Sequence, residues 1–175
     1  LLDISRSRIA ALEAGQSPIY EPGLDEILDE GRSSNRVSFT LDLEKGLEGV
    51  DVVFVCVGTP RSDSGEADLS FIRSALASVL QVVPSAPAVI KSTVPPGSYS
   101  DLAREFPDLV LVSNPEFLQQ GSAVADALRP DRVVIGSNSE TAIMLIRNLY
   151  APLEANGVEV IVTDTTSAEL IKYGA

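Results

Sequence analysis

The amino-acid sequence predicts an α/β protein built on a doubly wound, mostly parallel β-sheet. Short apolar runs rich in β-branched residues alternate along the chain with stretches whose apolar residues recur at helical spacing. The run at 52–57 is apolar at every position, whereas a strand with one face in water would alternate apolar and polar residues. Strands that are covered by helices on both faces and joined by right-handed crossovers have this pattern.

Six segments have the pattern of strands, and helices are expected between most of them. An apolar stripe at Ile143, Ile146 and Leu149 indicates one of the two longest helices, and Gly15 and Gly31 are suited to end the first two. The expected strands are 36–40, 51–57, 88–92, 109–113, 132–135 and 159–163, and the expected helices are 6–13, 24–30, 69–83, 140–155 and one that starts near 166 or 167.

The composition excludes several classes of function. The chain has 175 residues, of which 45% are hydrophobic, and we expect them to form one folded domain over 1–175. A formal charge of -12 repels phosphate backbones, so a nucleic-acid polymer is not expected as a partner. With no His and one Cys, the chain cannot build a Ser-His triad, a His-ligated metal site or an internal disulfide. No bound metal is expected.

The ends of the chain lead to expectations about its cellular setting. No apolar run is long enough to span a bilayer, and the first residues lack the charged segment of a signal peptide, so a cytoplasmic protein with no membrane partner is expected. The only Met is Met144, so Leu1 is not an encoded start. We therefore expect a domain that is incomplete at its N-terminus, without its first strand, and whose last helix is cut off at Ala175.

Residues that directly follow the strands are candidates for a binding site, because ligands of such sheets lie at the carboxyl ends of the strands. Asp3 follows a first apolar stub, and it either accepts hydrogen bonds from the ribose of a dinucleotide or caps the next helix. The segment Gly58 to Pro60 either lets a ligand approach the backbone or forms an ordinary tight loop. Cys56 lies within the apolar run and is interpreted as a small buried side chain rather than a nucleophile.

Three further side chains each have two interpretations. Thr93, ahead of two prolines, is either a rigidly held hydroxyl that positions a ligand or the cap of a helix. Glu116 lies beside two large apolar residues, an environment typical of a general base, or is an exposed loop residue. Lys172 either pairs with Glu169 on the solvent face of its helix or directs its ammonium into a cleft. Spacing alone does not decide between these alternatives.

Seven motifs occur in a fixed order and cover nearly the whole chain. They are 17–24 (SPIYEPGL), 57–60 (VGTP), 67–70 (ADLS), 91–97 (KSTVPPG), 114–118 (NPEFL), 129–136 (RPDRVVIG) and 167–173 (SAELIKY). In this combination the chain resembles the UDP-glucose/GDP-mannose dehydrogenase family of nucleotide-sugar 6-dehydrogenases, and most closely those members that act on UDP-glucose. The resemblance implies a Rossmann-like fold that binds NAD.

The family resemblance also implies a reaction. Such enzymes are NAD-dependent oxidoreductases of nucleotide-sugar metabolism and polysaccharide biosynthesis. They oxidise the C6 alcohol of the sugar to a carboxylate in two steps, through a thiohemiacetal and a thioester on a catalytic Cys. The implied NAD-binding residues are Asp3, Arg8, Val57, Gly58, Thr59, Pro60, Thr93 and Gln120. The implied substrate-binding residues are Glu116, Phe117, Leu118, Gln119, Gln120 and Lys172.

Three residues have catalytic roles by this resemblance. Glu116 matches the base that activates water for thioester hydrolysis, and Lys172 matches the lysine that stabilises oxyanion charge. Thr93 would lie near the nicotinamide and a catalytic water. Asp3 would hold the adenosine ribose, which favours NAD over NADP because a carboxylate repels a 2'-phosphate, and Arg8 would lie near the adenosine end.

The sequence also departs from the family pattern. Gln120 stands where the family has a second Glu near NAD, and Cys56 does not match the family nucleophile. The glycine loop and the nucleophilic Cys of the family are not among these residues, so we expect the 175 residues to be inactive alone and the full-length enzyme to be a homodimer. GDP-mannose and UDP-N-acetylmannosamine are alternative substrates, and a noncatalytic nucleotide-binding fragment is the alternative to an enzyme.

Overall fold

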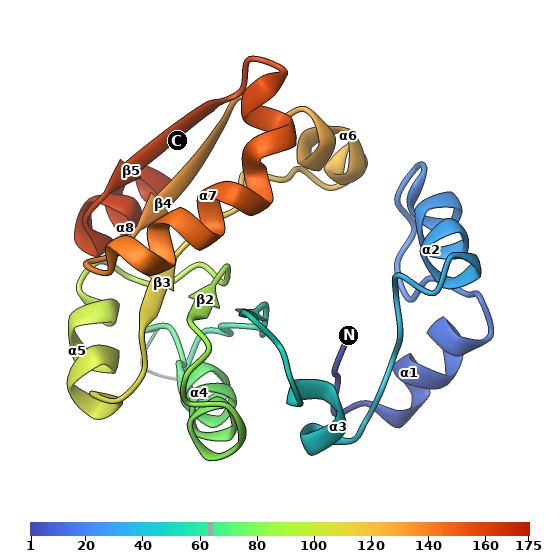
Figure 1. Ribbon diagram of the computed structural model, residues 1–175, viewed down its shortest axis with the longest axis horizontal. Coiled ribbons are helices and arrows are strands. Elements are labelled where there is room, and N and C mark those ends of the chain that lie inside the picture. Colours follow the sequence, from blue (N-terminus) through green and yellow to red (C-terminus); the bar gives the residue numbers. More distant parts are fainter. Residues whose placement is uncertain (63–64) are drawn as a thin grey trace. The chain divides into compact units, whose positions relative to one another are not determined.

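The computed structural model describes residues 1–62 and 65–175, and it divides the chain into two compact units (Figure 1). The first unit comprises Leu1–Glu48 and Leu118–Arg129, and the second comprises Gly49–Phe117 and Pro130–Ala175. Among the described residues, no helix has the length and apolar character needed to cross a membrane.

The first unit is mostly helical. Its helices are α1 (Arg6–Glu13), α2 (Leu24–Ser33), α3 (Leu43–Leu47) and α6 (Ala123–Leu128). The side chains of Ile9 and Leu12, which share one face of α1 at helical spacing, are buried as the sequence predicts. A parallel β-bridge joins Leu2 to Thr40.

The strand expected at 36–40 is wrong. Within this segment only Thr40 pairs, through its bridge to Leu2. The backbone N–H groups of Arg36 and Val37 instead donate to the carbonyl of Gly31, at 2.8 and 3.0 Å. Because these donors fold back onto the end of α2, they are not available to a strand ladder.

The second unit contains a five-stranded sheet and its helices. In chain order these are β1 (Val53–Val55), α4 (Ser70–Val82), β2 (Ala88–Ile90), α5 (Ser98–Glu105), β3 (Leu111–Ser113), β4 (Arg132–Gly136), α7 (Glu140–Ala155), β5 (Glu159–Thr163) and α8 (Thr165–Gly174). The strands follow one another in space as β1-β2-β3-β4-β5. All neighbours are parallel except β3 and β4, so the expected mostly parallel α/β sheet is confirmed.

The junction between β3 and β4 is short. A single residue pair, Ser113 with Gly136, registers the two strands. Side chains supplement this pair. The Nδ2 atom of Asn114 donates to the carbonyl of Val134 at 2.8 Å, and the hydroxyl of Ser137 donates to the carbonyl of Leu111 at 3.1 Å.

Helices pack on both faces of the sheet, as the sequence predicts. Alternate residues of β2 show the two faces: Ala88 and Ile90 belong to a buried cluster with side chains of α4 and α5, whereas Val89 belongs to another with Ile146 of α7. Residues on either side of the sheet are thereby removed from water, which is the main favourable contribution to folding.

The run at 52–57 is covered less completely than expected. β1 is an edge strand of the sheet, and Val55 is its buried residue. Phe54 is 36% exposed and Cys56 is also exposed, because their side chains point to the face opposite α4. The interpretation of Cys56 as buried is therefore wrong.

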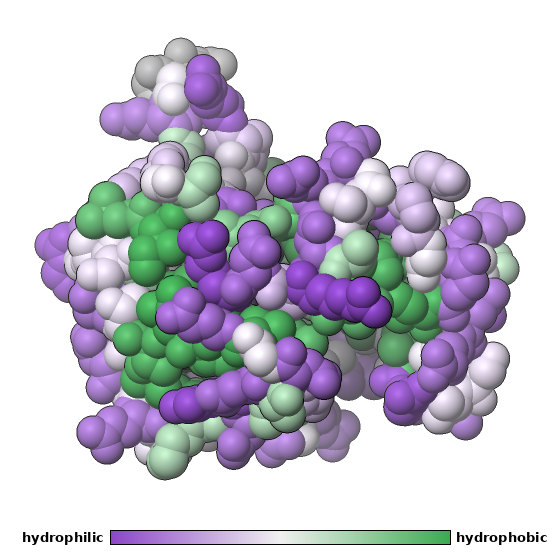
Figure 2. All heavy atoms as spheres, turned by 90° about the horizontal axis from the view of Figure 1, so that it is seen from above, coloured by the Kyte–Doolittle hydropathy of each residue, from purple (hydrophilic) through white to green (hydrophobic). Residues whose placement is uncertain are grey.

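Figure 2 shows hydrophobic side chains interspersed with hydrophilic ones over the face that it draws.

Candidate functional site

The loops after β1 and β2 meet in the second unit. The hydroxyl of Thr59 donates to the carbonyl of Thr93 at 2.9 Å, so the structure brings these two expected site residues together. Apart from the neighbours of Gly58 in the chain, no atom of the described residues lies within 4 Å of the position that a Cβ on Gly58 would take, which leaves the backbone there open to a ligand. Helix α5 begins at Ser98 with Gly97 as its N-cap, so the interpretation of Thr93 as a helix cap is wrong.

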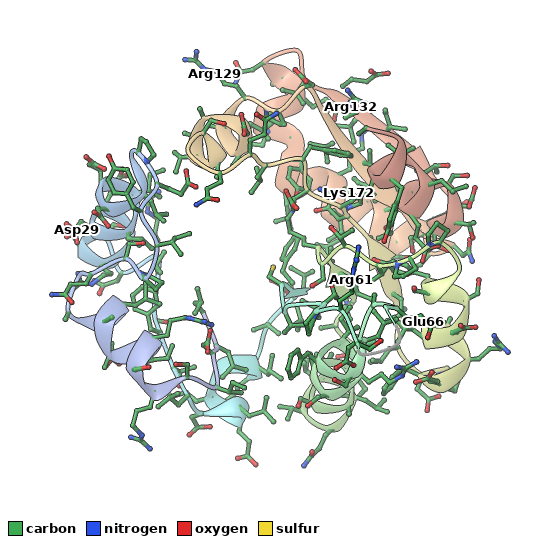
Figure 3. The ribbon with its side chains drawn as sticks, turned by 180° about the vertical axis from the view of Figure 1, so that it is seen from behind. Asp29, Arg61, Glu66, Arg129, Arg132 and Lys172 are labelled. Atoms are coloured by element: carbon green, nitrogen blue, oxygen red, sulfur yellow. The ribbon has the colours of Figure 1, made fainter. Side chains whose placement is uncertain are left out.

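A cavity of about 610 Å³ lies beside these loops, within the size range of cofactor sites. Its lining includes Arg61, Glu66 and Tyr173, which sequence reasoning did not single out; Arg61 and Glu66 are labelled in Figure 3. An antiparallel bridge between Arg61 and Ala67 brings both sides of this loop to the cavity, and no sequence pattern indicated that pairing. The full lining is Thr59, Arg61, Gly65, Glu66, Ala67, Thr93, Pro95 and Tyr173.

Glu116 and Lys172 meet although 56 residues separate them in the sequence. The Nζ atom of Lys172, on α8, lies 3.2 Å from Oε1 of Glu116 and donates to the backbone carbonyl of Glu116 at 2.5 Å. The side chains of Glu116 and Lys172 are 31% and 21% exposed, so the pair is partly shielded from water. Glu116 is therefore neither an exposed loop residue nor surrounded only by apolar groups.

Phe117 adds an aromatic surface to this pair. Its ring centroid lies 5.3 Å from Nζ of Lys172 and 5.7 Å from Cζ of Arg132, both within range of a cation–π interaction. The pairing of Lys172 with Glu169 within their helix is wrong, because Glu169 is buried and accepts from the backbone of Gly97 instead. Lys172 directs its ammonium toward Glu116.

Lys91 is a further charged neighbour that sequence reasoning did not assign to the site. Its Nζ donates to Oδ1 of Asn114 at 3.3 Å. Burial lowers the pKa of Lys91, and the charge of Lys172 lowers it further, while Cys56 and Glu116 raise it. Asn114, which accepts from Lys91, lies two residues before Glu116 in the chain, so Lys91 approaches the segment that carries Glu116. The signal in the sequence was a lysine near the end of the otherwise apolar expected strand at 88–92.

The surroundings of Cys56 disfavour the thiolate, which is the nucleophilic form of a cysteine. Neighbouring protein atoms desolvate the thiolate and raise the pKa of Cys56, and the charge of Lys91 offsets only part of that rise. The described residues hold no cluster of acidic or thiol groups that could bind a metal ion.

In the first unit, Asp3 and Arg8 form an ion pair of 2.6 Å. Oδ1 of Asp3 also accepts from the backbone N–H of Ser5 at 2.8 Å. Partial burial opposes ionisation, but these hydrogen bonds outweigh it and lower the pKa of Asp3. Ser5 is the N-cap of α1, so the interpretation of Asp3 as a helix cap is wrong. A carboxylate held in this way can accept hydrogen bonds from ribose hydroxyls, as the expected dinucleotide requires.

The segment 118–120 also belongs to the first unit, and its residues are exposed. The backbone N–H of Gln119 donates to Oδ2 of Asp126 at 2.9 Å. The carboxylate of Glu21 accepts from the N–H groups of Gly121, at 2.9 Å, and Ala123, at 3.3 Å. The nearby Asp126 and the remote Glu21 therefore hold the turn that carries the expected substrate residues Leu118, Gln119 and Gln120.

The chain is similar to several nucleotide-sugar dehydrogenases. It is 43% identical to UDP-glucose 6-dehydrogenase of Rickettsia conorii, a match that covers 99% of this chain and 41% of that protein. A solved UDP-glucose dehydrogenase of Pyrobaculum islandicum is 36% identical with a TM-score of 0.89, over 99% of this chain and 42% of that one. A ternary complex of GDP-mannose dehydrogenase from Pseudomonas aeruginosa is 31% identical with a TM-score of 0.91, also over 99% and 42%. The chain thus spans about two fifths of the length of these relatives.

A family model, described as the NAD binding domain of the UDP-glucose/GDP-mannose dehydrogenase family, matches residues 1–154. This match confirms the family resemblance and the expected NAD cofactor, and the similar folds confirm the Rossmann-like sheet. The relatives are named as nucleotide-sugar dehydrogenases, which are oxidoreductases. Because the match covers well over half of the residues, the chain belongs to the UDP-glucose/GDP-mannose dehydrogenase family and contains its NAD-binding domain.

Proposed function

We propose that this chain is the NAD-binding part of an enzyme that oxidises the C6 alcohol of UDP-glucose to the carboxylate of UDP-glucuronate, a four-electron oxidation through thiohemiacetal and thioester intermediates. The observation that carries the proposal is the pairing of Lys172 with Glu116 at 3.2 Å, although 56 residues separate them in the sequence. A carboxylate can accept a proton, and an ammonium fixed beside it can stabilise the negative charge that develops during reaction at the same carbon.

Glu116 acts in this proposal as the base that takes a proton from the water that hydrolyses the thioester. Lys172 stabilises the negative charge that develops on the C6 oxygen, since its ammonium is held in a partly shielded environment where charge interactions are stronger than in water. Phe117 supplies an apolar wall beside Lys172. Leu118, Gln119 and Gln120 contact the nucleotide sugar.

NAD, when bound, accepts the hydride in each oxidation step. Asp3 accepts hydrogen bonds from its adenosine ribose, and Arg8 lies near the adenosine end. Val57, Gly58, Thr59 and Pro60 line the path of the cofactor, with the hydroxyl of Thr59 oriented by the carbonyl of Thr93. Thr93 orients the nicotinamide and a water. Gln120 lies beside the cofactor as an uncharged side chain. We place the whole protein in the cytoplasm, as a homodimer that serves polysaccharide biosynthesis.

GDP-mannose is the second candidate substrate, favoured by the TM-score of 0.91 with the dehydrogenase that is named for it. The experiment is to express the protein encoded by the complete gene and to follow NADH with UDP-glucose, GDP-mannose and UDP-N-acetylmannosamine. We expect two NADH for each UDP-glucose consumed. If NADH forms with GDP-mannose alone, the substrate is GDP-mannose rather than UDP-glucose. If the protein binds NAD but turns over no nucleotide sugar, a noncatalytic protein is favoured.

A further inference from the structure

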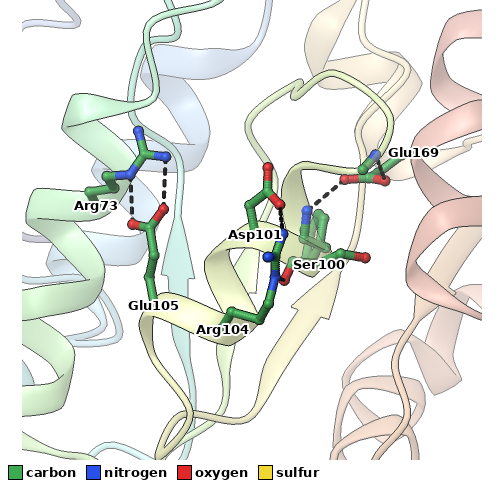
Figure 4. A network of polar contacts seen from close by, with 8 residues as sticks. Arg73, Ser100, Asp101, Arg104, Glu105 and Glu169 are labelled. Carbon is green, nitrogen blue, oxygen red and sulfur yellow. Dashed lines mark hydrogen bonds and ion pairs between the residues drawn. The ribbon is translucent and has the colours of Figure 1, made fainter.

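Glu169 is a buried carboxylate for which the proposed chemistry has no use. It lies on α8 and is 2% exposed. Its Oε2 accepts from the backbone N–H of Gly97 at 2.7 Å, and its Oε1 accepts from that of Tyr99 at 2.9 Å. Figure 4 labels Glu169 and marks its hydrogen bonds with dashed lines. Burying a carboxylate costs free energy unless it is hydrogen-bonded, and the unpaired N–H groups at the start of α5 supply those bonds.

The segment that Glu169 binds is itself fixed to the sheet. Tyr99 is buried, and its hydroxyl lies 3.0 Å from the carbonyl of Ile90 and 3.1 Å from that of Val112. Ile90 ends β2, which leads to Thr93, and Val112 lies in β3, which leads to Glu116. Glu169 therefore joins α8 to the point where these two strands end.

Glu169 and Lys172 lie three residues apart on α8, a spacing that places both on one side of a helix. The turn that holds Glu169 also packs tightly, because Ala168 lies directly against Gly136 of β4. The helix is thus anchored one turn before the residue whose ammonium must reach Glu116.

We propose that Glu169 is a positioning residue: by binding the N–H groups of Gly97 and Tyr99 it fixes α8 against the ends of β2 and β3, and so sets the position of the Lys172 ammonium. The inference rests on the proposed function of Lys172. Lysine has a long, flexible side chain, so the placement of its charge depends on the helix that carries it.

The test uses the complete protein with Glu169→Gln, which keeps the size of the side chain but turns an amide N–H₂ toward one of the two backbone donors. A misplaced catalytic group of this kind should lower kcat by about tenfold to a hundredfold, with the KM for NAD little changed. The matched control is Glu105→Gln on α5, where the carboxylate forms an exposed ion pair with Arg73 (Figure 4); kcat should stay within about twofold of wild type. If Glu169→Gln does not fold, Glu169→Asp takes its place.

A double-mutant cycle with Lys172→Met separates positioning from a general loss of stability. If Glu169 acts through Lys172, Glu169→Gln should lower kcat in the wild-type background and add no further loss when Lys172 is already replaced. An equal fractional loss in both backgrounds would overturn the proposal.

A crystal structure of the Glu169→Gln protein supplies a readout that does not need activity. The distance between Nζ of Lys172 and Oε1 of Glu116, 3.2 Å here, should exceed the ion-pair limit of about 4 Å. An unchanged distance would overturn the inference. Absence of NADH formation by the wild-type protein with every nucleotide sugar would refute the proposed function instead, and this distance would then decide the positioning role by itself.

Discussion

Ala168 packs on Gly136 so closely that a Cβ added to Gly136 would stand 2.6 Å from the Cβ of Ala168. The same Cβ would lie 2.8 Å from the backbone oxygen of Asp164 and 3.1 Å from Cα of Thr165. Since backbone atoms cannot rotate away as a flexible side chain can, β4 and α8 approach each other only because residue 136 is a glycine.

Gly136→Ala should therefore destabilise the protein by about 1–3 kcal/mol, because α8 must move outward to admit the methyl group. Urea denaturation measures the loss. Gly58→Ala is the control: outside its chain neighbours, the part of the chain that the structure describes places no atom within 4 Å of the added Cβ, so the change should stay within about 0.5 kcal/mol. Equal stability of the Gly136→Ala and wild-type proteins would show that α8 is not packed as described.

Glu116→Gln should slow thioester hydrolysis in the complete enzyme by about 10²- to 10⁴-fold, because an amide cannot accept the proton of the attacking water. Rapid-quench measurement of the enzyme-bound thioester and equilibrium binding of NAD would separate the two steps. Glu154→Gln, at an exposed ion pair with Arg147, is the matched control and should behave as wild type. A loss of NAD affinity as large as the loss of hydrolysis would contradict the role given to Glu116.

Glu21→Ala should weaken binding of the nucleotide sugar. Removal of this carboxylate leaves the N–H groups of Gly121 and Ala123 without their acceptor, at a cost of about 1–3 kcal/mol, and loosens the turn that follows Gln120. Calorimetric titration with UDP-glucose would measure the change in Kd. The control is Glu26→Ala, at an exposed position on α2, which should leave Kd unchanged. If the two variants bind UDP-glucose with the same affinity, Glu21 does not support substrate binding through this turn.

Asp164→Asn should reduce the loss of stability in acid. The hydroxyl and backbone N–H of Ser167 lower the pKa of Asp164, which is the N-cap of α8. The folded state thus binds fewer protons than the unfolded chain, so this contribution is complete above the unfolded pKa of about 4 and is lost as the pH falls through the lower folded value. Urea denaturation at about pH 6 and about pH 3 should show a smaller difference for the variant, because an amide does not titrate. The same difference in both proteins would contradict the assignment.

The sequence predicted those parts of the fold whose signals are local. The helix at 140–155 has the predicted bounds, since a Ser cap and an apolar stripe define it, and β1 to β5 lie within or next to the expected strands. Helix α5 was missed, because its start at Ser98 is stabilised by Glu169, about 70 residues away, and a run of Pro and Gly precedes it. The strand at 36–40 was predicted from residue type, but strands also require a neighbour, and the segment folds back on α2.

In the candidate site, too, local patterns identified residues but did not predict their contacts. Motifs identified Glu116 and Lys172 as functional residues, whereas their spacing left open whether Lys172 pairs within its own helix or with a remote group. That choice depends on the burial of Glu169, a tertiary property that helical spacing does not contain. Lys91 lay inside a quoted motif, yet its proximity to Glu116 follows only from the parallel register of β2 and β3.

The short junction between β3 and β4 leaves few backbone hydrogen bonds between the two parts of the second unit's sheet. Because one residue pair and the side chains of Asn114 and Ser137 replace a full ladder, β4, β5 and α7 form a block that is joined to β1, β2 and β3 mainly through side chains. In native-state hydrogen exchange these two blocks should open as separate sub-global units, with the amides of β4 and β5 exchanging together. Ligand-free protein would then sample partial openings at this boundary, which the buried side chains of Val89, Val112, Val133 and Ile135 and the bonds of Glu169 to the start of α5 oppose.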